Sequence, residues 1–251
     1  FSSGTAKGGN SGSILVGTGA ATAGRGGLVS ITVGSGTSGV GGGINIATGR
    51  SVSLTGGALA IATGEGTSTS SGAITIRTAN SGDSGSSGRL VFSSGTSNGG
   101  NTGALYIGSG VATGGRGGAV SMTVGTGTSG AGGQMVLSAG DSTASATGGA
   151  FYLASGQSSA TTSGNLFMWT PDAGSSGVSG SVSMYTGTVS SGVSGSVSMY
   201  TGASSAGTTG SITIRTGAAT SGSGGDITLP SGSGSGAVGG DISLIADQAS
   251  T

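Results

Sequence analysis

The stretch SVSMYTG occupies residues 181–187 and recurs without a single change at residues 196–202. Related stretches follow at the same spacing, as SITIRTG from residue 211, DITLPSG from residue 226 and DISLIAD from residue 241. The period runs back to the first residue, so the chain consists of about seventeen copies of one 15-residue motif. A short fixed period of this kind is typical of solenoid proteins, in which each repeat contacts only its neighbours.

Each copy alternates between apolar and small polar residues. With Ser181 as position 1, positions 2 and 4 are apolar in every copy, whereas positions 3 and 5 are mostly serine, threonine or alanine. The residues at positions 2 and 4 are termed the apolar rows. An apolar residue at every second position is the pattern of a β-strand with one buried face. The pattern predicts strands over residues 181–186, 196–201 and 211–216, and over the same positions of the other copies.

Glycine recurs at fixed positions of the motif. It occupies position 7 in all but three copies, and it is the last residue of every copy from Gly12 to Gly240. Three copies, which begin at residues 73, 134 and 165, contain one extra residue and also end in glycine. Glycine at fixed positions indicates turns, because it accepts φ > 0 without steric cost. The sequence therefore predicts an all-β fold, a single-domain parallel β-solenoid of about seventeen 15-residue coils over residues 1–251. Its core is expected to be the thin stack of the apolar rows.

The composition argues against several classes of protein. The net charge is zero and only 6% of the residues are charged, whereas nucleic-acid-binding proteins present a basic surface. Cysteine and histidine are absent, which leaves neither disulfides nor Cys/His metal sites. No stretch approaches the roughly 18 apolar residues of a membrane span. We expect no cofactor, no bound metal, no nucleic-acid partner and no membrane span.

Catalysis has little support in the sequence. Asp226 and Asp241 share position 1 of neighbouring copies, and two carboxylates placed close together can perform acid–base chemistry. Turn residues at the start of a strand explain them better, because no cleft is evident. The pattern GxGxxG at residues 34–39 and 125–130 is expected by chance in so glycine-rich a chain, and no helix follows it. We therefore expect no enzyme activity.

The ends of the predicted solenoid suggest assembly. Phe1 lies at an inward position of the first, partial copy, and Ile242 and Leu244 belong to the last predicted strand. Unpaired terminal strands are templates for further pairing unless polar caps cover them. We expect copies to join end to end through Phe1, Ile242 and Leu244, with caps in flanking sequence as the alternative. Basic residues concentrate in the first half and acidic residues near the end, which also favours head-to-tail attraction, although sparse solvated charges explain them equally well.

Aromatic side chains gather at two outward positions, 3 and 5, of neighbouring copies. Together with one arginine they are termed the aromatic set: Tyr152, Phe167, Trp169, Tyr185, Tyr200 and Arg215. An exposed ladder of aromatic rings indicates contact with a partner. We predict lateral contact with other copies or surface proteins, or a platform for glycan rings. Stabilisation of the ladder by neighbouring side chains is the alternative.

Threonine recurs at position 10, on the return leg of the predicted coil. Regular threonine ranks on a flat solenoid face are able to bind ice. The rank is formed by Thr22, Thr37, Thr67, Thr113, Thr128 and Thr220. It is interrupted by Lys7, Val52 and Asn98 at the same position, so ice binding ranks below the other readings.

The phrases SGSVSMYTGT, GGAVSMTVGTGTSGAGG and GGDISLIAD resemble Gly/Ser/Thr-rich repeat proteins encoded by microalgae and related eukaryotes. The resemblance covers the whole chain, implies a secreted surface or fibrous component, and carries over no catalytic residue. We therefore expect a structural subunit of an extracellular filament, hair, sheath or adhesive fibre at the cell surface, which assembles with itself head to tail. An ice-binding or glycan-binding module is the alternative function.

Overall fold

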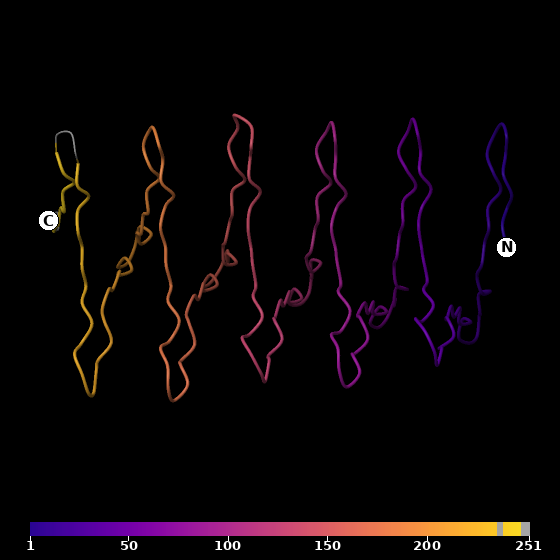
Figure 1. Ribbon diagram of the computed structural model, residues 1–251, viewed down its shortest axis with the longest axis horizontal. Helices are drawn as coiled ribbons and strands as arrows, with labels where there is room; N and C mark the ends of the chain where they lie inside the picture. The colour runs from indigo at the N-terminus through magenta and orange to yellow at the C-terminus, as the bar shows by residue number, and fades with distance from the viewer. Residues whose placement is uncertain (235–237, 247–251) are drawn as a thin grey trace. The chain divides into compact units, whose positions relative to one another are not determined.

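The computed structural model describes residues 1–234 and 238–246 of the chain. Within these residues the chain forms neither a helix nor a β-strand, and Figure 1 accordingly draws neither a coiled ribbon nor an arrow. The chain divides into two units, Phe1–Thr123 and Val124–Thr251, and each unit is described by itself. The single repeat domain expected over residues 1–251 stays a prediction.

The predicted parallel β-solenoid is wrong for the described residues. None of the strands expected over residues 181–186, 196–201 and 211–216 forms. A solenoid requires the backbone groups of one copy to pair with those of the next copy. Glycine makes up 62 of the 251 residues, loses more conformational freedom on ordering than any other residue, and has no side chain to bury. Within the described residues the backbone therefore closes local loops, and no strand pairing links one copy to the next.

The repeat period nevertheless appears in the backbone, as one bend in each copy up to residue 225. Successive bends are one repeat apart, except that an extra residue precedes the bend in the copies that begin at residues 73, 134 and 165. Figure 1 shows the resulting narrow loops, in which the chain turns back on itself. The bends lie at residues 7–9, 22–24, 37–39, 52–54, 67–69, 83–85, 98–100, 113–115, 128–131, 144–146, 159–161, 175–177, 190–192, 205–207 and 220–222.

Each loop narrows to a neck where positions 6 and 7 meet the closing glycine of the same copy. The amide of Gly57 donates a hydrogen bond to the carbonyl of Gly49 at 2.9 Å. The same bond recurs from Gly72 to Gly64 at 3.1 Å, and at 2.8 Å from Gly149 to Gly140, from Gly164 to Gly156 and from Gly240 to Gly232. These bonds stay within one copy, in contrast to the ladder between copies that the alternation predicted.

Close approach, and not an unusual backbone conformation, accounts for the closing glycines of some copies. None of them that the structure describes has a positive φ, contrary to the turn conformation expected from the sequence. A Cβ added to Gly42 would lie 2.6 Å from Cγ1 of Val33, and one added to Gly133 would lie 2.7 Å from Cγ1 of Val124. Only glycine therefore lets the second leg of these loops pass the side chain at position 6.

Eleven of the fifteen bends share one of two local features. In one group, the third residue of the bend is a glycine with positive φ: Gly9, Gly39, Gly85, Gly130, Gly177, Gly192 and Gly222. In the other group, a serine immediately before the bend accepts a hydrogen bond from the amide of the third residue. The pairs are Ser51 with Leu54 (3.0 Å), Ser97 with Gly100 (3.1 Å), Ser158 with Thr161 (2.9 Å) and Ser204 with Gly207 (3.0 Å). In these bends the serine hydroxyl accepts a hydrogen bond from a backbone amide, whereas the other group relies on a glycine with positive φ.

The described residues have no hydrophobic core. None of their apolar side chains is buried, and the accessible surface of the chain is 24533 Å². A compact protein of this mass exposes about 9,500 Å², and its extended chain about 33,000 Å². The chain alone therefore removes from water only about a quarter of the surface that an extended chain exposes, where a compact protein removes about 70%.

Alanine at Gly66 is expected to open the loop over residues 64–72. The added Cβ would lie 2.5 Å from the carbonyl oxygen of Ser70 and 2.9 Å from that of Thr69, and both are backbone atoms that move only if the loop moves. The hydrogen bond from Gly72 to Gly64 should then be lost, so that the Gly72 amide exchanges with solvent about tenfold faster. Gly64→Ala is the matched control, because nothing lies within 4 Å of a Cβ added there. Equal exchange rates in the two variants, measured by NMR, would contradict the described loop.

Candidate functional site

The apolar rows keep their alternation although the described residues form no sheet. Side chains at position 2 are 48% to 59% exposed, and Val182 (59%) and Met184 (61%) are better covered than the neighbouring Tyr185 (85%). The second identical stretch repeats this gradient at Val197, Met199 and Tyr200. One side of each apolar segment is therefore partly covered, and the side chains at position 2 still expose about half of their surface.

The extent of this exposed apolar surface points to a partner. Soluble monomers rarely expose contiguous apolar patches of more than a few hundred Å², and larger patches mark sites of interaction. Here the apolar rows recur in every copy, in both units of the chain. We therefore take the apolar rows as the main candidate interaction surface.

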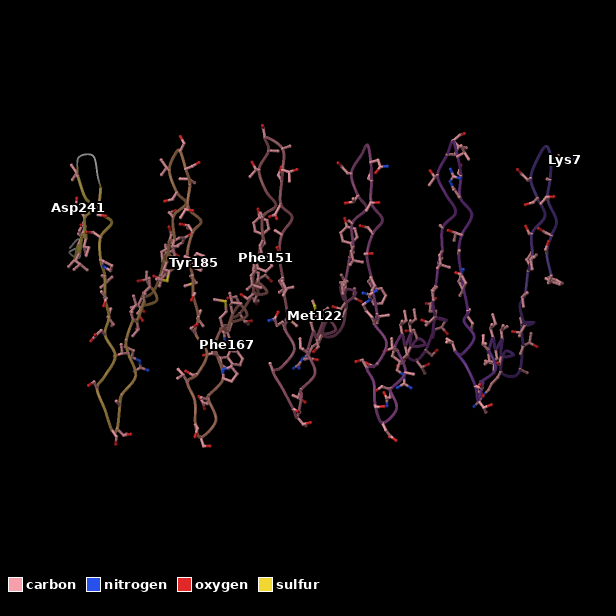
Figure 2. The ribbon with its side chains drawn as sticks, viewed as in Figure 1. Lys7, Met122, Phe151, Phe167, Tyr185 and Asp241 are labelled. Atoms are coloured by element: carbon pink, nitrogen blue, oxygen red, sulfur yellow. The ribbon has the colours of Figure 1, made fainter. Side chains whose placement is uncertain are left out.

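The aromatic set lies in the unit Val124–Thr251 and is exposed throughout. The exposed fractions run from 73% for Phe167 to 89% for Tyr152, and Arg215 is also exposed. Figure 2 labels Phe167 and Tyr185, whose side chains stand off the ribbon. The described residues form no sheet on which these side chains could stand as a ladder. Their role in lateral contact stays a prediction, carried by their exposure alone.

The residues expected to join chain ends are exposed as well. Phe1 belongs to the unit Phe1–Thr123 and is fully exposed, whereas Ile242 (56%) and Leu244 (95%) belong to the other unit. No terminal strand is present in the described part of the chain, so stacking of strands does not follow from this structure. Phe1, Ile242 and Leu244 are accordingly treated as members of the apolar rows.

The threonines considered for ice binding occupy bends. Thr22, Thr37, Thr67, Thr113, Thr128 and Thr220 are each the first residue of a bend. An ice-binding plane needs its threonines on flat, regularly repeated backbone. Three of these six bends have a glycine with positive φ as their third residue and the other three do not, so the threonines do not stand on one regularly repeated backbone.

The polar groups form no reactive arrangement within the described residues. Asp226 and Asp241 are exposed, and no group of three or more ligand-type side chains is placed to hold a metal ion. An open hollow of roughly 290 Å³ lies beside Arg77, Ala79 and Asn80, but it brings together only one cationic and one amide side chain. Asp247, one of the acidic residues near the end of the sequence, lies outside the described residues. No helix of the described chain has the length and apolarity of a membrane span.

The three longer copies contain a feature that sequence reasoning missed. Thr78, Ala139 and Thr170 occupy position 6 of these copies and are half-buried, whereas the same position is exposed in the other copies that the structure describes. In the copy from residue 165, the Thr170 hydroxyl donates to the carbonyl of Gly180 at 3.1 Å and closes the neck beside Trp169. The extra residue, visible in the sequence, was the available signal for the partial burial of position 6 in these copies.

Comparison with family models, with curated proteins and with solved structures finds no match for this chain.

Proposed function

We propose that this protein is a structural, self-associating component of an extracellular filament, sheath or adhesive fibre, in which further copies of the same chain cover the apolar rows. The observation that carries the proposal is the exposure of these rows in every copy the structure describes. Burial of apolar surface contributes roughly 25 cal/mol per Å². Association is therefore the available source of the stability that the described residues, which form no core, lack.

Self-association is favoured over a different partner for two reasons. The rows recur in every repeat along the whole chain, so any two copies of the chain present matching surfaces at many relative positions. The chain also has zero net charge, which removes the electrostatic repulsion that keeps most soluble proteins apart. The proposed association relies on the apolar side chains and not on stacking of terminal strands.

The extracellular role rests on the resemblance to Gly/Ser/Thr-rich surface and fibrous proteins. Binding of glycans is the second candidate, and the observation that favours it is the exposure of Trp169, Tyr185 and Tyr200, whose flat rings are able to stack on sugars. A structural component needs no catalytic residue, in keeping with the expectation of no enzyme activity.

The test is the state of the purified protein as a function of concentration. We expect the sedimentation coefficient to rise steeply with concentration, and electron microscopy to show fibres or networks built from many copies. A protein that stays monomeric up to millimolar concentration would contradict the proposal and direct attention to glycan binding.

A further inference from the structure

The two units of the chain carry opposite net charges. The unit Phe1–Thr123 contains two acidic residues, Glu65 and Asp83, and six basic residues, which gives it a net charge of +4. The unit Val124–Thr251 contains a single basic residue, Arg215, and five acidic residues, which gives −4. The basic residues of the first unit are Lys7, Arg25, Arg50, Arg77, Arg89 and Arg116. The acidic residues of the second unit are Asp141, Asp172, Asp226, Asp241 and Asp247.

The reversal of charge also holds at equal positions of the repeat. At position 8, one copy of the first unit carries Arg50, whereas two copies of the second unit carry Asp141 and Asp172. At position 1, one copy of the first unit carries Arg89, whereas two copies of the second unit carry Asp226 and Asp241. Glu65, at position 8 of the first unit, is the exception. Apart from Glu65, the charged residues at these two positions of the motif are therefore basic in the first unit and acidic in the second.

All of these side chains in the described residues are exposed, so their charges are available to a second molecule. Contact between like units of two copies would bring together charges of the same sign. Contact between unlike units would bring together charges of opposite sign, and such complementarity sets the choice and orientation of partners. Few other charges compete, because only 6% of the residues are charged.

We propose that a second copy of this chain associates with its acidic unit, Val124–Thr251, against the basic unit, Phe1–Thr123, of the first. This inference rests on the proposed self-association and adds its direction. The apolar rows supply the attraction, and the opposite charges of the units decide which halves of two copies meet.

The experiment exchanges charges without altering the composition. The variant R50D/R89D/D141R/D226R keeps every residue count and the zero net charge, but brings the net charge of each unit to zero. At about 0.02 M salt, where the screening length is about 20 Å, we expect its critical concentration for association to exceed that of the wild type about tenfold. The single exchange R50D/D141R halves the charge of each unit and should lie between the two. In about 0.5 M salt, where screening is strong, the three proteins should associate alike.

The outcomes separate this inference from the proposed function. Association of the four-residue variant at the wild-type concentration in low salt would overturn the directional pairing and leave self-association standing. Absence of association of the wild type in any salt would overturn both. A graded, salt-sensitive loss across the two variants supports the pairing of unlike units, because composition and total charge are unchanged.

Discussion

Serine in place of Val182 and Val197 raises the concentration needed for self-association about thirtyfold. The two valines occupy position 2 of the two identical stretches and are 59% and 58% exposed in the single chain. Burial of the remaining surface against another copy should contribute about 1 kcal/mol for each valine, or about 2 kcal/mol together. Sedimentation velocity over a concentration series measures the shift.

The matched control is Val178→Ser with Val193→Ser. These valines are also one repeat apart and are 95% and 96% exposed, but they follow the bends and lie outside the apolar rows. We expect their replacement to change the critical concentration less than threefold, an effect below about 0.7 kcal/mol. An equal loss in the two double variants would show that apolar content in general, and not the rows at positions 2 and 4, drives association.

Removal of the three largest exposed rings of successive copies, in the variant W169S/Y185S/Y200S, should weaken association about a hundredfold. Aromatic side chains are the usual energetic centres of interfaces, and each has most of its surface still free to be covered. A loss of about 1 kcal/mol for each ring accounts for an effect of this size. Light scattering on dilution from the associated state provides the measurement.

Tyr106→Ser is the control for the aromatic set, because Tyr106 is 93% exposed but belongs to the unit Phe1–Thr123 and is not a member of the set. It should lower association by no more than a few-fold. If the triple variant associates normally but no longer binds soluble polysaccharides that the wild type retains, the aromatic set is a glycan platform and its assignment to lateral contact is wrong.

Much of the local structure could be predicted from the sequence. The 15-residue period, the three copies with an extra residue, and the alternation of covered and exposed side chains around Val182 and Tyr185 all reappear in the structure. Each of these depends on residues a few positions apart. The serines before the bends, such as Ser158, could have been recognised as well, because a hydroxyl that satisfies an amide three residues later is a purely local device.

The sequence by itself determined where the chain bends and which side chains share a side, whereas only the tertiary structure decided whether successive copies pair. The alternation at positions 2 and 4 is compatible with a ladder between copies and equally with separate loops, because the direction of a side chain is a local property of the backbone. Pairing depends instead on whether the gain from buried apolar surface exceeds the loss of conformational freedom over a chain rich in glycine. In the described residues that balance favours the necks, where Gly57 bonds to Gly49 and Gly42 passes the side chain of Val33, and it leaves the apolar rows exposed.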